Sequence, residues 1–274
     1  MIAAMPRKLK IGILGVGSIG QTFANAVDKG RVEAELVAVC DQDTARATNF
    51  AAVLASRPAV VSIDELIDRT DLVVEAASQA ALPMLVPKAL AAGRDLLVLS
   101  VGGLLGHDDW FREAGKKGCH IFVPSGAIAG LDGIKSASIG RIDSAVLTSR
   151  KPAAALKGTK YVAEHGIAVD EMKQETVIFD GTAEEAARAF PTTSNVAASL
   201  RLSVDTAAPV RVRVVAVPGG TQNVHEIRVK GEFGELSVDI KNVPSAANPR
   251  TSQLAAFSAL ATLANLTRAL RVGN

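Results

Sequence analysis

The chain has 274 residues and a net charge of +2, with 48% hydrophobic and 21% charged residues. This balance suits one large or two smaller globular domains with a sizeable core. The near-neutral charge gives no reason to expect nucleic acid or an anionic membrane as a partner. No apolar stretch approaches the length of a membrane span, and the first residues lack a signal-peptide pattern. The two cysteines lie beside apolar segments, so we expect reduced thiols in a cytoplasmic protein.

The first informative stretch is a glycine motif that follows a short apolar run at residues 11–14. In a nucleotide-binding turn of this spacing, the first glycine permits a sharp turn and the second lets a pyrophosphate approach the backbone. The third lets the next helix pack closely on the strand. That helix directs free N–H groups and its positive dipole end at the phosphate. The cofactor-binding residues predicted from this motif are Gly15, Gly17, Ser18, Ile19 and Gly20.

A second apolar run, residues 35–40, ends in Asp41, about 20 residues after the last glycine of the motif. A carboxylate at this place accepts hydrogen bonds from the ribose hydroxyls of a dinucleotide. It would repel the 2′-phosphate of NADP, and no arginine follows it directly. We therefore predict that Asp41 binds the cofactor and that the cofactor is NAD, with NADP as the alternative. The competing interpretation is a structural turn with an incidental aspartate.

Strands and helices alternate through the first 124 residues. Beyond those named above, strands are predicted at 59–63, 71–77, 95–101 and 120–123, and helices at 44–55, 64–68, 80–92 and 107–117. Such alternation is typical of a doubly wound parallel sheet of the Rossmann type, an α/β fold. We predict a dinucleotide-binding domain over residues 1–124, joined by a C-terminal helix at 249–274.

The pattern changes after Pro124, where a stretch of small residues, 125–133, leads into a helix. Strands are predicted at 143–150, 210–217, 223–230 and 235–241, and helices at 182–190 and 195–204. The last two strands are expected to form a hairpin. We predict a second α+β domain with a mostly antiparallel sheet over residues 125–248, which serves in substrate binding, catalysis and dimerisation.

One strand of the second domain carries polar groups on an apolar face. Asn223 and His225 alternate with Ile227 and Val229, so all four share the face that we expect to be buried. Such groups either find partners in the core or line a pocket. An isolated histidine is more often structural, but a neighbouring cofactor domain favours proton transfer. We predict His225 as the catalytic residue and Asn223 as a substrate-binding residue.

Other polar residues are weaker candidates. Arg150 and Lys151 follow a strand and are suited to holding a carboxylate, although a solvated basic turn explains them equally well. Asn195 is either a helix N-cap or a cofactor contact. Thr251 lies in a segment that either begins a helix or contacts an anion. The remaining histidines do not combine with acidic residues in close register, so we predict no metal site.

Several segments, in order along nearly the whole chain, resemble the L-aspartate dehydrogenase family. They are residues 15–20, 124–132, 150–152, 179–181, 190–191, 195–198, 223–226 and 248–252. The resemblance implies NAD(P)-dependent oxidative deamination of L-aspartate to iminosuccinate, and then to oxaloacetate and ammonia. It also implies a soluble homodimer and a link to pyridine nucleotide biosynthesis.

By the same resemblance, His225 is the catalytic acid/base, and Ala127 and Asn195 contact the cofactor near its nicotinamide. Ala129 is the other small residue of that turn suited to the contact. One departure is Asp180, which stands where a glutamate is more usual.

Two alternatives stay open. One is a reductase of the same two-domain shape that acts on another small substrate. The other is a non-catalytic NAD-binding sensor, in which His225 would be dispensable. The polar pair Asn223 and His225 has no obvious use in a pure binder.

Overall fold

A computed structural model describes residues 8–191, 194–204, 210–243, 252–270 and 272–273. Contacts between residues divide the chain into two compact units. Unit 1 contains residues 1–100, 107–124 and 259–271, and unit 2 contains residues 101–106, 125–258 and 272–274. The predicted domain boundaries differ from this division at three places. Residues 101–106 and 272–274 belong to unit 2, and the C-terminal helix α11 (Gln253–Thr267) is divided after residue 258.

Unit 1 is built on a six-stranded parallel sheet with the order β3-β2-β1-β4-β5-β6. Its strands are β1 (Leu9–Leu14), β2 (Ala34–Cys40), β3 (Ala59–Val60), β4 (Leu72–Glu75), β5 (Asp95–Val98) and β6 (Ile121–Phe122). This order confirms the predicted Rossmann-type sheet. Strand β3 ends earlier than predicted because Ser62 and Glu65 form a capping box that starts α3 at Ile63.

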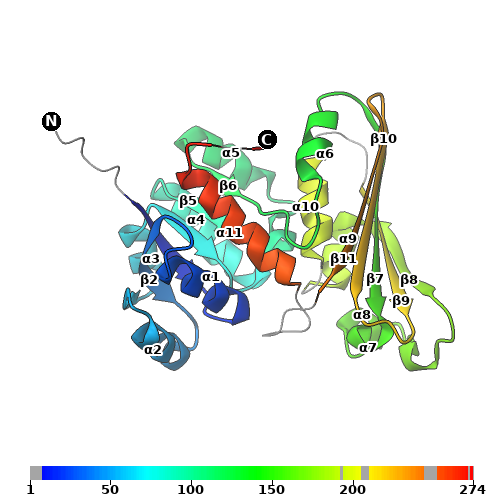
Figure 1. The fold of residues 1–274 in the computed structure, drawn as a ribbon, viewed down its shortest axis with the longest axis horizontal. Helices are drawn as coiled ribbons and strands as arrows, with labels where there is room; N and C mark the ends of the chain where they lie inside the picture. The colour runs from blue at the N-terminus through cyan, green and yellow to red at the C-terminus, as the bar shows by residue number, and fades with distance from the viewer. Residues whose placement is uncertain (1–7, 192–193, 205–209, 244–251, 271, 274) are drawn as a thin grey trace. The chain divides into compact units, whose positions relative to one another are not determined.

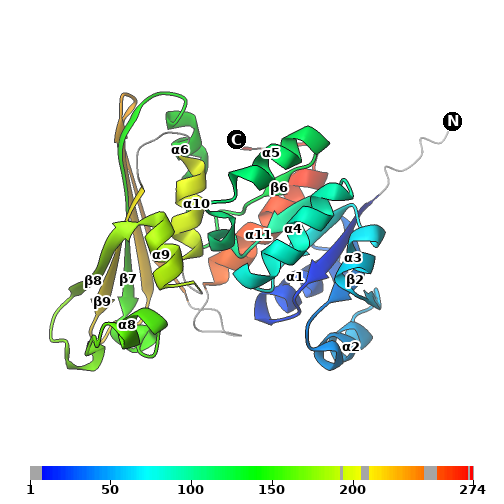
Figure 2. The ribbon, with the colours of Figure 1, turned by 180° about the vertical axis from the view of Figure 1, so that it is seen from behind.

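Helices cover both faces of the sheet of unit 1 (Figures 1 and 2). The helices are α1 (Ser18–Asp28), α2 (Thr44–Val53), α3 (Ile63–Arg69), α4 (Leu82–Ala91) and α5 (Asp108–Lys117). Phe23 of α1, Phe50 of α2 and Leu263 of α11 share one apolar cluster with the strands. Helix α4 packs against β5 and against the neighbouring helices α3 and α5. The turn from β1 into α1 lies beside the end of β2, where the Val16 N–H donates to Asp41.

Unit 2 contains a five-stranded sheet with the order β11-β10-β7-β9-β8. Its strands are β7 (Ile142–Pro152), β8 (Thr176–Thr182), β9 (Val210–Val217), β10 (Asn223–Gly231) and β11 (Gly234–Asn242). Among the described strands of this sheet, only the β7–β9 pair is parallel, so the mostly antiparallel sheet and the β10–β11 hairpin are confirmed. Strand β8 was not predicted, because polar and apolar residues do not alternate regularly in this short segment.

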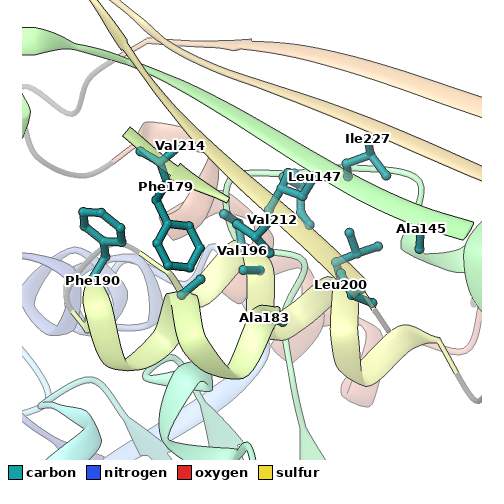
Figure 3. Close-up of a cluster of buried hydrophobic side chains, with 14 of the residues drawn as sticks. Ala145, Leu147, Phe179, Ala183, Phe190, Val196, Leu200, Val212, Val214 and Ile227 are labelled. Carbon is teal, nitrogen blue, oxygen red and sulfur yellow. The ribbon is translucent and has the colours of Figure 1, made fainter. Parts of the chain in front are cut away.

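Helices cover one face of the sheet of unit 2. They include α6 (Leu131–Ala137), α9 (Ala183–Ala189) and α10 (Asn195–Ser203), while α7 (Ala153–Leu156) and α8 (Lys160–Glu164) follow β7. Figure 3 shows Leu147, Val212 and Ile227 of the sheet turned toward Val196 and Leu200 of α10. Among the described residues, the opposite face carries half-buried and exposed side chains around a shallow groove. No helix in the described ranges has the length and apolar character of a membrane span.

Candidate functional site

The three glycines of the turn between β1 and α1 have different roles, two in the fold and one beside open space. Gly15 has a φ of +93°, and a Cβ there would meet the Ala76 backbone at 2.7 Å. A Cβ on Gly20 would collide with the Gly15 carbonyl oxygen. A Cβ on Gly17 would meet nothing within 4 Å, and its φ of −71° suits any residue. The fold therefore needs Gly15 and Gly20, whereas the space beside Gly17 fits a pyrophosphate.

The first turn of α1 is suited to an anion. Gly17 is its N-cap and provides no side-chain hydrogen bond, so the first N–H groups of the helix are not capped by a side chain. No acidic residue lies in this first turn. Free N–H groups and the positive end of the helix dipole attract phosphate. Ser18 and Ile19 supply the first two of these N–H groups.

Asp41 follows β2 and is held rigidly. One of its oxygens, Oδ2, accepts a hydrogen bond from the Val16 N–H at 2.7 Å, and Oδ1 accepts one from the Asp43 N–H at 2.9 Å. Burial alone would raise the pKa of Asp41, but these bonds and the nearby Arg46 lower it. The carboxylate is thus ionised and linked to the glycine turn, which fits a role in ribose recognition.

An arginine lies beside Asp41, which the sequence did not indicate. Asp43 caps α2 by accepting the Arg46 N–H, and this cap brings the Arg46 guanidinium to 2.6 Å from Asp41 Oδ1. The Arg46 side chain is 43% exposed, whereas that of Asp41 is 3% exposed. The argument against NADP from the absence of an adjacent arginine is therefore weakened. An exposed guanidinium next to the Asp41 carboxylate is suited to contact a 2′-phosphate.

His225 lies near the start of β10, on the helix-covered face of the sheet of unit 2. It is paired in register with Ser149 of β7, and the Ser149 hydroxyl and His225 Nδ1 are 2.9 Å apart. The residue is only 4% exposed. Burial, with a smaller contribution from the positive charge of Lys151, lowers the pKa of His225 to about 3. His225 is therefore neutral near pH 7, and its ring orientation is fixed by Ser149.

Lys151 is the second ionisable group on this face. It lies two residues beyond Ser149 on β7, so the two side chains point to the same side of the sheet. The residue is 8% exposed, and burial lowers the pKa of Lys151 to about 8. A neutral imidazole and a buried amine thus share the helix-covered face of the sheet of unit 2, and the charge of the amine acts on the imidazole.

Comparisons with known proteins were consistent along the whole chain. Residues 132–266 match the model of the family described as aspartate dehydrogenase, C-terminal, and residues 15–124 match the homoserine dehydrogenase NAD-binding domain. An L-aspartate dehydrogenase of Methanosarcina mazei is 45% identical over 97% of this chain and 99% of that protein. The chain belongs to the L-aspartate dehydrogenase family. It is an NAD(P)-dependent dehydrogenase.

Further relatives of the family agree with this assignment. An L-aspartate dehydrogenase of Bordetella bronchiseptica is 37% identical over 97% of this chain and 98% of that protein. The crystal structure of aspartate dehydrogenase from Thermotoga maritima superimposes with a TM-score of 0.75 at 26% identity. That alignment covers 97% of this chain and all of the other.

The other residues predicted from the family pattern lie in different surroundings. Arg150 is on the sheet face opposite His225, where it pairs with Glu226 at 2.9 Å and Glu175 at 3.3 Å. Arg150 and Lys151 lie on opposite faces because adjacent residues of a strand point to opposite faces, and the substrate role of Arg150 stays a prediction. Asn223 is half-buried at the start of β10, on the side of His225.

Two predicted cofactor contacts have partners within unit 2. Asn195 is the first residue of α10, not its N-cap, and its Oδ1 accepts a hydrogen bond from the Gly102 N–H at 3.2 Å. The Ala127 carbonyl accepts a hydrogen bond from Asn242 at 3.0 Å. These bonds fix the turn and the helix start. Thr251 lies outside the described residues.

Sequence reasoning did not single out Ser149, and it grouped Lys151 with Arg150. The predicted strand stopped at residue 150, whereas β7 runs to Pro152. Alternation along the longer strand would have placed Lys151 on the same face as Ser149 and Arg150 on the other. No cluster of three residues able to hold a metal ion occurs within the described parts of the chain.

Proposed function

We propose that this protein oxidises L-aspartate with NAD as cofactor and releases oxaloacetate and ammonium by way of iminosuccinate. In the balanced reaction, aspartate, NAD⁺ and water give oxaloacetate, ammonium, NADH and a proton. The observation that carries the proposal is a neutral histidine, His225, held by Ser149 on a buried sheet face in a chain of this family. Its relatives are named L-aspartate dehydrogenases.

In this proposal His225 performs the proton transfers. When Nδ1–H donates to the Ser149 hydroxyl, Nε2 is left as an acceptor that takes a proton from the substrate ammonium. The free amine can then lose a hydride from Cα. Hydride loss leaves the protonated imine, and His225 then releases the first proton to solvent, so that Nε2 is free to take a proton from the water that attacks the imine carbon. The Ser149 hydroxyl can donate or accept, so it supports both protonation states of the ring.

The cofactor is proposed to lie on the glycine turn of unit 1. Gly17 provides the space for the pyrophosphate, the first turn of α1 provides N–H donors, and Asp41 provides the ribose contact. NAD, when bound, supplies the acceptor for the hydride that leaves Cα. Ala127 and Asn195 remain proposed contacts near the nicotinamide.

We further propose a homodimer formed through the exposed sheet face of unit 2. Apolar residues that include Val146 and Val177 lie there among ion-paired charges such as Arg150 and Glu226. A face that mixes apolar and paired polar groups in this way resembles the composition of subunit interfaces. A cytoplasmic location and a contribution to pyridine nucleotide biosynthesis remain predictions from the sequence.

The deciding experiment follows the absorbance of NADH with purified protein in both directions. NADH should be consumed only when oxaloacetate and ammonium are both present, and it should form from L-aspartate and NAD. Consumption with another keto acid or a semialdehyde, but not with oxaloacetate, would indicate the reductase alternative. Tight NADH binding without turnover of any substrate would indicate the sensor.

A further inference from the structure

A buried polar cluster on the helix-covered face of the sheet of unit 2 contains more polar side chains than a single acid/base needs. It consists of Ser149, Lys151, Ser194 and His225, each no more than 8% exposed. Burying a lysine in a core costs free energy, so a lysine this deeply buried calls for a structural or a functional reason. The charge of Lys151 acts on His225 and contributes to its lowered pKa. The two groups are therefore electrostatically coupled.

The proposed substrate is a dicarboxylate, so its site needs cations. Arg150, the neighbouring cation, lies on the other face and already pairs with two carboxylates. Lys151 is the cation that shares a face with His225 on β7 and β10 within the described residues. We propose that Lys151 binds a carboxylate of the substrate, with the Ser194 hydroxyl as a second ligand. This inference rests on the proposed function, from which it takes the substrate class.

Ser194 provides an independent observation. Its residue is 5% exposed, and its hydroxyl has no hydrogen-bond partner in the part of the chain that the structure describes. A buried hydroxyl without a partner costs free energy, so it indicates an absent ligand. Ser149, Lys151 and Ser194 line one cavity between the sheet and helices α9 and α10. Its volume of about 10 Å³ suits one water-sized group, such as a carboxylate oxygen, and not a whole substrate.

We call Lys151 with its bound carboxylate the carboxylate anchor. Because Lys151 acts on His225, this anchor should also change the basicity of His225. In the free protein, the positive charge of Lys151 disfavours protonation of His225. A carboxylate bound to Lys151 would neutralise that charge, so His225 would become more basic when substrate is present. Proton abstraction is thereby favoured in the substrate complex.

The pH dependence of this anchor involves few other groups. On the same sheet face, the titratable neighbour of Lys151 is His225. On the covering helices, Glu184 of α9 pairs with Arg201 of α10 at 3.1 Å, and Glu185 caps α9 through Thr182. Arg188 of α9 is exposed.

Succinate is the probe for this test, because it has two carboxylates and no amine to oxidise. Its affinity for the intact protein is measured by calorimetry for wild type, Lys151→Met, Lys151→Arg and Lys157→Met. Lys157 is the matched control, since it is exposed and pairs with Asp170 at 2.6 Å. We expect Lys151→Met to weaken succinate binding about 10- to 100-fold, the loss of one charge-assisted pair. Lys157→Met should bind as wild type does.

Two further readouts separate an anchor from a structural lysine. Wild-type affinity for succinate should fall as pH rises above about 8, where Lys151 loses its proton, and Lys151→Arg should flatten this dependence. In turnover, Lys151→Met should raise KM for aspartate more than it lowers kcat. Succinate binding that is unchanged in a folded Lys151→Met variant would overturn the inference, as would wild-type binding that is independent of pH.

The inference and the proposed function can fail separately. If wild type oxidises aspartate and Lys151→Met has an unchanged KM, the anchor is wrong and the function stands. If wild type binds succinate through Lys151 but does not oxidise aspartate, the carboxylate site stands and the reaction is wrong.

Discussion

The Asp41 carboxylate and the Arg46 guanidinium lie 2.6 Å apart at the end of β2, with the aspartate buried and the arginine half-exposed. Three hydrogen bonds, from Val16, Asp43 and Arg46, occupy most of the acceptor capacity of the carboxylate. The arginine keeps further N–H donors on a planar group suited to phosphate. The pair therefore offers a hydrogen-bond acceptor suited to a ribose hydroxyl and hydrogen-bond donors suited to a phosphate.

This pair predicts how cofactor preference responds to mutation. Arg46→Ala should raise KM for NADP about 10-fold or more, because a charge-assisted contact is lost, and leave KM for NAD nearly unchanged. Steady-state rates with each cofactor at saturating substrate measure the ratio. Equal losses with both cofactors would mean that Arg46 only positions Asp41.

Gly17 and Gly20 should respond oppositely to the same substitution. Gly17→Ala should leave the melting temperature nearly unchanged, since the added Cβ meets nothing, but weaken NADH binding about 10-fold or more. Gly20→Ala should destabilise the fold, because its Cβ overlaps the Gly15 carbonyl. Thermal unfolding and fluorescence titration with NADH separate these effects. Undiminished NADH affinity in Gly17→Ala would place the pyrophosphate elsewhere.

His225→Ala should reduce kcat for aspartate oxidation about 100-fold or more and leave NADH affinity intact. The imidazole is removed from unit 2, whereas the glycine turn belongs to unit 1. Ser149→Ala should give a smaller loss, because it frees the ring without deleting it. Single-turnover rates and NADH titration provide the comparison. A fully active His225→Ala variant would remove the acid/base assignment.

The exposed sheet face of unit 2 predicts a change in oligomeric state. Val177 on β8 is 54% exposed, and it lines the groove on this face. Val177→Asp should convert a dimer to a monomer, because it buries a charge without a partner in the interface. Light scattering after size exclusion measures the mass. Ile139→Asp is the control, since Ile139 is an exposed apolar residue outside this sheet. A dimer that survives Val177→Asp must use another surface.

Much of the fold was predictable because its signals are local. The glycine turn, the apolar strands of unit 1 and the hairpin between β10 and β11 are each encoded in a few consecutive residues. The face of His225 followed from alternation within a single strand, and the structure buries His225, Ile227 and Val229 together. Such features depend little on distant parts of the chain.

The features that sequence reasoning missed depend on distant partners. Glu75 looked like part of an apolar strand, yet it is fully buried and accepts hydrogen bonds from Ser100 and the Ala77 N–H. Arg46 meets Asp41 only because α2 begins where Asp43 caps it. Lys151 was separated from Arg150 only when β7 proved to run to Pro152, where its pairing with β9 continues the strand. Register and helix placement decide these contacts, and neither is written in a short motif.

The buried amine of Lys151 also predicts a gain in stability when it is removed. Its pKa is about 8 in the folded protein and near 10.5 in the unfolded chain, so folding releases a proton between these values. The free energy of unfolding should therefore rise with pH across that window, and the full penalty of burial applies below pH 8. Lys151→Met should stabilise the protein at pH 7 by about 3 kcal/mol. Urea unfolding of both proteins at pH 7 and pH 10 measures this, and the difference should shrink at pH 10. A destabilised Lys151→Met variant would mean that hydrogen bonds of the lysine hold the fold, whereas a stabilised but impaired variant would mean that the lysine is retained for function.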